Sequence, residues 1–81
     1  MTEKYSNLLN RVVCDPEILA GKPTIKGTRV SVALILNLVA HGATFAEILD
    51  DYPYLVEDDL KAALLNAESQ MNHGEARALA S

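Results

Sequence analysis

The sequence predicts a mainly α-helical domain in which three helices follow short N-terminal β-strands. Its 81 residues include three Tyr, one Phe and no Trp, so the core must be built from Leu, Ile, Val and Ala, which favours helices packed on helices. Capping signals divide residues 32–73 into three helical segments, whereas residues 11–30 are richer in strand formers, glycine and proline. A chain this short forms one domain with a modest core, which favours a homodimer.

The N-terminal part is predicted to contain short β-structure after a flexible arm. Residues 1–10 are mostly polar without a helical or strand period, so we expect a loosely held arm. Residues 11–14 predict a strand, which Asp15-Pro16 ends, and residues 17–19 form either one helical turn or an extended link. Residues 23–25 and 28–30 flank the turn dipeptide Lys26-Gly27 and predict a hairpin, after which Ser31 caps the first helix.

Three helices are predicted from capping signals and apolar periodicity. Residues 32–40 are apolar on nearly every side, as in a helix central to a bundle or dimer, and Gly42 is placed to end this helix. Thr44 and Glu47 match a capping box at the start of a second helix, which Pro53 ends near residue 52. A third helix starts near residues 56–57, and Gly74 is expected to end or loosen it. The inward-facing positions expected on the second and third helices are Phe45, Ile48, Leu49, Leu60, Ala63, Leu64, Ala67 and Met71.

These assignments divide the chain into an arm at 1–10, a single domain at 11–73 and a C-terminal tail at 74–81.

Charge is distributed unevenly between the N-terminal part and the rest of the chain. Residues 1–30 carry five cationic side chains and three carboxylates, a net charge of +2, whereas residues 31–81 carry two and eight, a net charge of −6. Phosphate groups would therefore bind the N-terminal part, and a basic protein surface would suit the C-terminal part.

The sequence offers little support for catalysis. The lone Cys14 is expected to be a small buried apolar residue, and without a signal or spanning segment the protein is expected to be cytoplasmic and away from membranes. His41 and His73 are isolated, with His41 placed to balance a helix C-terminus. Adjacent aspartates diverge by about 100° on a helix, which suits solvated faces. We therefore expect a protein that is not an enzyme and has no metal or cofactor.

Two patterns favour a binding function. The short helix, tight connector and longer helix have the spacing of a helix-turn-helix, which also occurs in other three-helix domains, and carboxylates at the start of the third helix oppose groove reading. The second pattern is a cationic loop around Gly27 that would suit an anion; alternatively, it is a solvated hairpin whose Arg29 pairs with a nearby carboxylate. Tyr52 and Tyr54 are expected to seal the corner between the second and third helices, or Tyr54 anchors a partner. The DNA- or anion-binding candidates are Lys22, Lys26, Thr28 and Arg29.

Five segments together resemble the domain of unknown function family 433. In order they are DPEIL at 15–19, GKPTIKGTRVSV at 21–32, HGAT at 41–44, YPYL at 52–55 and DLKAAL at 59–64. The match covers about residues 11–67. The resemblance implies a helix-turn-helix-like (homeodomain-like) domain after short strands. By position it assigns Tyr52 and Pro53 to the inter-helix corner, and the signature loop to Gly21, Lys22, Pro23, Gly27, Thr28 and Arg29.

Family members are described as antitoxins of the VapB type, which silence a PIN-like ribonuclease toxin and bind promoter DNA as dimers. In this chain Val56 replaces the usual Thr or Ser before the third helix, which removes a cap worth about 1 kcal/mol. The leading hypothesis is therefore an antitoxin-like protein, and the alternative is a DNA-binding regulator without a toxin. The candidate toxin contacts are Tyr54, Glu57, Asp58, Asp59, Glu68 and Glu75.

Overall fold

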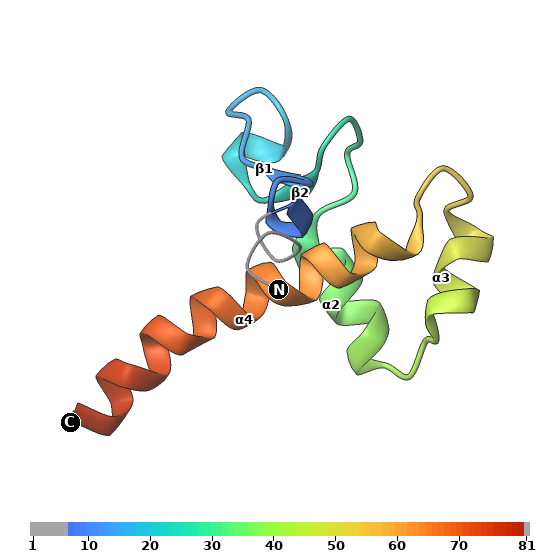
Figure 1. Ribbon diagram of the computed structural model, residues 1–81. Helices are drawn as coiled ribbons and strands as arrows, with labels where there is room; N and C mark the ends of the chain where they lie inside the picture. Colours follow the sequence, from blue (N-terminus) through green and yellow to red (C-terminus); the bar gives the residue numbers. More distant parts are fainter. Residues whose placement is uncertain (1–6, 81) are drawn as a thin grey trace.

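The computed structural model describes the backbone of residues 7–80 and the side-chain environment of residues 7–71. Among these residues the chain forms two short strands, a 3-10 turn and three longer helices (Figure 1). A mainly helical domain preceded by short strands is thus confirmed. None of the helices in the described part is long and apolar enough to cross a membrane. The elements are β1 (Val12–Val13), η1 (Leu19–Gly21), β2 (Thr24–Ile25), α2 (Val32–Ala40), α3 (Phe45–Asp51) and α4 (Glu57–Ala80).

The two strands form one antiparallel ladder in which Val12 pairs with Ile25 and Val13 with Thr24. The strand expected at residues 11–14 is therefore present, but its partner is β2. The expected hairpin between residues 23–25 and 28–30 forms only in part: the Ile25 N–H donates to the Val30 carbonyl, and Thr24 bridges Ser31. Residues 28–30 do not form a strand because the Thr28 hydroxyl accepts the Val30 N–H at 3.0 Å, a local bond that competes with ladder pairing.

The segment between the strands contains a left-handed turn. Leu19, Ala20 and Gly21 have φ angles of 49°, 55° and 83°, of which only the last suits its residue type without strain. The helical turn considered for residues 17–19 therefore lies two residues later. Before it, the Asp15 carboxylate accepts the Glu17 N–H at 2.9 Å, which confirms the predicted turn.

The starts and ends of α2 and α3 follow the capping residues of the sequence. The Ser31 hydroxyl accepts the Leu34 N–H at 2.9 Å, and α2 ends at Ala40 before Gly42, whose φ is 94°. At α3 the Thr44 hydroxyl accepts the Glu47 N–H, and the Glu47 carboxylate accepts the Thr44 N–H. Both bonds of the predicted capping box are thus present.

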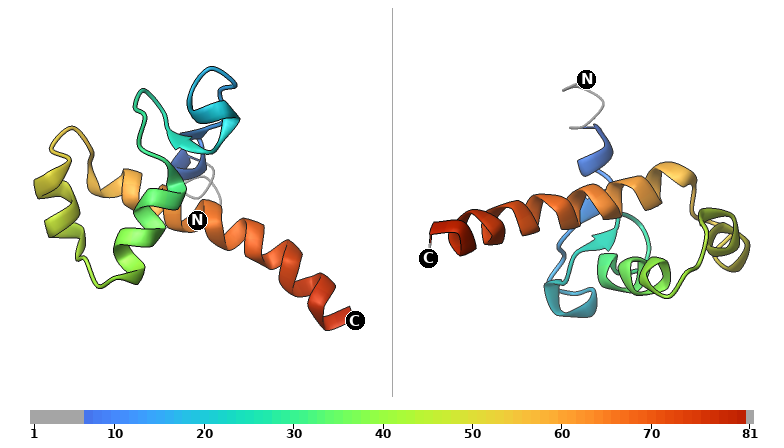
Figure 2. Two further views of the ribbon diagram at one scale, coloured as in Figure 1. Left: turned by 180° about the vertical axis from the view of Figure 1, so that it is seen from behind. Right: turned by 90° about the horizontal axis from the view of Figure 1, so that it is seen from below.

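Helix α4 begins at Glu57, although Val56 has no side chain that can cap it. The Asp59 carboxylate instead accepts the Val56 N–H at 3.0 Å, which satisfies one of the unpaired amide groups at this helix start. Of the two outcomes expected at Gly74, an end of the helix is not observed, because α4 continues to Ala80. Its first part packs beside α2, and its second half projects away from the other elements in all views (Figures 1 and 2).

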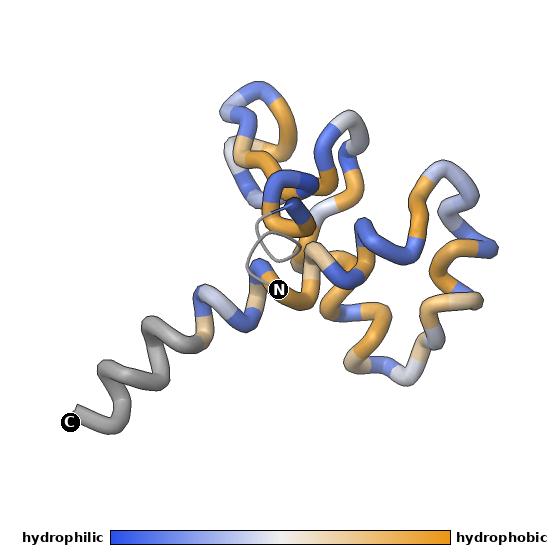
Figure 3. The backbone as a smooth tube through the Cα atoms, viewed as in Figure 1, coloured by the Kyte–Doolittle hydropathy of each residue, from blue (hydrophilic) through white to orange (hydrophobic). Residues whose placement is uncertain are grey.

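The core lies along α2 and the first turns of α4, with the two strands on one side and α3 on the other (Figure 1). Figure 3 shows hydrophobic residues along α2 and on the segments around it. The helices converge because each turns its apolar residues to this centre, and the burial predicted for Ile48, Leu60 and Ala63 is confirmed. The core residues are Ile25, Val30, Val32, Ile35, Ile48, Leu55, Leu60 and Ala63.

Two predicted interior positions are wrong. Met71 is 71% exposed because α4 has by then left the core, and Cys14 is exposed because β1 ends one residue earlier. The last part of the expected N-terminal arm also packs, since residues 7–9 are helical and Leu8 is buried. The remaining part of the arm, residues 1–6, lies outside the described residues.

Candidate functional site

The cationic loop is the first candidate surface. Lys22, Lys26 and Arg29 are all exposed, and the ion pairs within the described residues involve only the cations Arg11 and Lys61. The alternative in which Arg29 pairs with a nearby carboxylate is therefore not seen among these residues. Thr28 serves the turn itself, because its hydroxyl donates to the Ile25 carbonyl at 2.8 Å in addition to accepting the Val30 N–H. Lys26 and Arg29 thus lie on a hydrogen-bonded turn after β2, whereas Lys22 lies before β2.

Arg11 is a site residue that the sequence did not reveal. Its Nη1 donates to Asp59 Oδ1 at 3.0 Å, and its Nη2 lies 3.9 Å from Asp58 Oδ2. Asp59 is only 8% exposed and accepts the Val56 N–H with its other oxygen. A burial of this kind is tolerated because the carboxylate is both paired and hydrogen-bonded. Two separate features of the sequence could have indicated this ion pair. Arg11 is a cation at the start of a predicted strand, and Asp59 is a carboxylate three residues after Val56, which cannot cap a helix.

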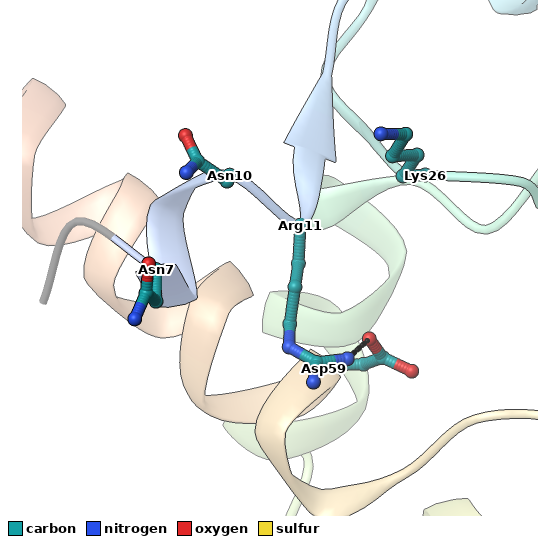
Figure 4. A pocket seen from close by; sticks show the side chains of 5 residues that line it. All are labelled: Asn7, Asn10, Arg11, Lys26 and Asp59. Carbon is teal, nitrogen blue, oxygen red and sulfur yellow. Dashed lines mark hydrogen bonds and ion pairs between the residues drawn. The ribbon is translucent and has the colours of Figure 1, made fainter. Parts of the chain in front are cut away.

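A polar hollow of about 350 Å³ opens beside this ion pair (Figure 4). In Figure 4, Arg11 extends along α4 to Asp59, whereas Lys26 and Asn10 point away from that carboxylate. The Lys26 N–H donates to the Arg11 carbonyl at 2.7 Å, so the ladder places these two cations next to each other. The residues that line the hollow are Asn7, Asn10, Arg11, Lys26 and Asp59.

Some of the candidate toxin contacts are exposed, and others are bonded to groups of the same chain. Tyr54, which stands 6.3 Å from Tyr52 between ring centroids, is 62% exposed, and Glu57 and Glu68 are exposed. Glu57 also pairs with Lys61 at 3.2 Å. Asp59 is only 8% exposed and each of its oxygens is bonded inside the chain, so little of this side chain is accessible to a partner. Asp58 is partly exposed, and the side chain of Glu75 lies outside the described residues.

An apolar groove of about 290 Å³ separates the start of α2 from the part of α4 that leaves the core. Its polar members are the amides Asn66 and Gln70, and no charged side chain of the described residues lines it. Met71, at one end, is the most exposed large apolar side chain of those described. The apolar residues of the groove are Pro23, Val32, Ala33, Leu36, Ala67 and Met71.

The titratable residues away from these surfaces have structural roles. His41 caps α2, with its Nδ1 2.7 Å from the Asn37 carbonyl oxygen. The pKa of Glu47 lies below its usual value, because hydrogen bonds with Thr44 favour the charged carboxylate. The bond from the Thr44 N–H is the larger cause, and the bond with the Thr44 hydroxyl is the smaller one. Within the described residues, no three His, Cys, Asp or Glu side chains are grouped so that they could hold a metal ion.

Comparisons with known proteins agree with the resemblance seen in the sequence. A crystal structure of a DUF433 member protein from Anabaena variabilis superposes with a TM-score of 0.70 and 28% identity, covering 99% of this chain and 79% of that one. An uncharacterized protein, y4eO, from Sinorhizobium fredii is 33% identical over 66 residues. The match takes in 82% of this chain but only 30% of y4eO, so the chain spans less than a third of the length of that relative. The family model "Protein of unknown function (DUF433)" matches residues 12–67, and the chain therefore belongs to the DUF433 family.

Proposed function

We propose that this chain is a non-enzymatic, antitoxin-like protein that binds and inhibits a PIN-like ribonuclease toxin. The observation that carries the proposal is the second half of α4, which projects from the core beside the apolar groove and exposes Met71 (Figure 2). Apolar surface rimmed by polar residues is typical of protein contacts. Met71 and the groove would form the centre of such a contact.

Charge supports a basic partner. The half of the chain that contains α4 has a net charge of −6, and a ribonuclease must hold cations where it binds RNA phosphates. Exposed Glu57 and Glu68 lie on α4, and Tyr54 precedes it. The toxin contact would extend along α4 from this end to Met71, so that the helix covers the RNA-binding groove of the enzyme.

The test is co-expression of the tagged chain with the product of its neighbouring gene, followed by a ribonuclease assay. We expect a stoichiometric partner whose ribonuclease activity appears only when this chain is removed. Met71→Glu should weaken the complex, because it places a charge in an apolar contact. Leu19→Glu is the matched control, since Leu19 is also apolar and 41% exposed but lies in η1, outside α4 and the groove. Recovery of no partner, or of one whose activity the chain leaves unchanged, contradicts the proposal.

A stand-alone DNA-binding regulator is the second candidate, favoured by the exposure of Lys22, Lys26 and Arg29 without ion pairs among the described residues. In either case we propose a homodimer that uses α2, where Leu38 and Val39 are only partly buried and lie outside the groove. The purified chain should shift duplex DNA at low salt, and Arg29→Ala should weaken this shift. Light scattering should give the mass of a dimer. A monomer that binds no duplex contradicts the regulator.

A further inference from the structure

The polar hollow is lined by two cations at opposed positions of the β-ladder, of which Arg11 extends to Asp59 and Lys26 points away from that carboxylate (Figure 4). Val12 pairs with Ile25, and the bond from the Lys26 N–H to the Arg11 carbonyl continues this register by one position. Like charges at directly opposed positions of a ladder are destabilising. Arg11 is offset by Asp59, but Lys26 has no ion-pair partner among the described residues.

Besides the two cations, the hollow is lined by the amides of Asn7 and Asn10, which can both donate and accept, and by the carboxylate of Asp59. Asp59 has one oxygen bonded to Arg11 and the other to the Val56 N–H, so its nearest acceptor positions are in use. Asn7 and Asn10 are exposed and contribute amide hydrogens to the rim of the hollow. Such a set, a cation with neighbouring amide donors and a second cation at the far end, suits an oxyanion.

We propose that this hollow is a binding site for a phosphate group, held by Lys26 and the amides of Asn10 and Asn7, with Arg11 completing its far end. All five residues that line the hollow are polar or charged, which differs from the mostly apolar pockets that hold neutral small molecules. Its volume of about 350 Å³ leaves room for what the phosphate is attached to, so a nucleotide and a nucleic-acid backbone present the same chemistry. The site needs no toxin and is independent of the function proposed above.

The chain as a whole carries a net charge of −4, so general electrostatics oppose anion binding, and saturable binding would come from a local site. The test is an NMR titration of the full chain at low ionic strength with two probes, inorganic phosphate and a mixed-sequence DNA duplex. We expect saturable shifts of the backbone amides of Asn10, Arg11 and Lys26. Lys26→Gln should weaken phosphate binding about tenfold or more, the size of one charge-assisted hydrogen bond.

Lys61→Gln is the matched control, since Lys61 is a partly exposed lysine on α4 that does not line the hollow. It should change the affinity less than about twofold if the site is local. Asn10→Asp, which places a carboxylate on the rim, should abolish binding. Binding of phosphate alone indicates a small phosphorylated ligand, and binding of the duplex with the same Lys26 dependence indicates a nucleic-acid backbone. Equal effects of the two lysine variants, or no saturable shift with either probe, overturn the proposal.

Discussion

Arg11 Nη1 and Asp59 Oδ1 lie 3.0 Å apart and join the start of β1 to the first turn of α4 across 48 positions of the chain. The same carboxylate accepts the Val56 N–H. The Asp59 side chain therefore both caps the start of α4 and holds the start of β1 against it. The Lys26 N–H in turn donates to the Arg11 carbonyl. The cationic loop, the polar hollow and the start of α4 are therefore held by one set of connected bonds.

Removing the Asp59 side chain should lower the free energy of unfolding, although the residue lies in the first turn of a helix. Asp59→Ala leaves the Val56 amide without its partner and Arg11 without its close carboxylate, at a cost of about 1–3 kcal/mol. The measurement is urea unfolding followed by circular dichroism. Asp50→Ala is the control, because Asp50 is exposed and takes part in none of the ion pairs described, and it should change stability by no more than about 0.5 kcal/mol.

The coupling of the two residues is measured by adding Arg11→Met and the double variant. Because Arg11 is partly exposed, with 41% of its side chain accessible, solvent screens the pair and the coupling should be about 0.5–1 kcal/mol. Additive effects of the two single variants would show that Asp59 acts only as a cap.

The capping box of α3 should make stability depend on pH through Glu47. The Thr44 N–H holds the pKa of this carboxyl below its usual value in the folded chain, so the unfolded chain binds the proton more readily. The contribution of Glu47 is therefore complete above its unfolded pKa and is lost as the pH falls through its folded pKa. Wild type should be more stable than Glu47→Gln at neutral pH, and this difference should disappear in acid.

Thermal unfolding from neutral pH to acid measures this difference. Glu17→Gln is the matched control, because Glu17 is an exposed carboxylate outside any cap, and its difference from wild type should vary little with pH. A stability difference for Glu47→Gln that is constant through the acid range would mean that the capping bond does not depend on the charge of the carboxylate.

The local features of the fold were predictable and the long-range ones were not. The caps made by Ser31 and Thr44 each involve a residue three positions away, so the sequence contains both partners of each bond in one window. The pairing of β1 with β2 and the bond between Arg11 and Asp59 depend on how distant segments pack. Within the candidate site, the exposed cations were recognisable from the loop, but the polar hollow was not, because Asn7, Asn10 and Arg11 come from a different segment.

Periodicity also failed to show where the core ends. The three- and four-residue spacing on α4 continues to Met71, but α2 is much shorter than α4 and the helix passes beyond it. The periodicity shows which face of a helix is apolar. A residue on that face is buried only where another element packs against that part of the helix.

A pair of truncations on α4 tests this limit of the core. Leu60→Ala removes a side chain with no exposed surface and should cost about 2–5 kcal/mol, because it leaves a cavity. Met71→Ala removes a similar volume from a residue that is 71% exposed and should cost less than about 0.5 kcal/mol. Chemical unfolding of both variants gives the comparison. A large loss for Met71→Ala in the isolated chain would indicate that its surface is covered by a second copy, and light scattering would then show the dimer dissociating.

The turn after α2 should depend on glycine for backbone reasons alone. Gly42 has a φ of 94°, a conformation that L-residues rarely adopt, yet a Cβ placed there meets no atom within 4 Å. Gly42→Ala should therefore cost about 1–2 kcal/mol through backbone strain and not through a steric clash. Gly42→Asn should recover part of this loss, since asparagine tolerates left-handed conformations better than alanine. Urea unfolding of the two variants measures the difference, and a larger loss for Gly42→Asn than for Gly42→Ala would show that side-chain volume, not the φ angle, limits this position.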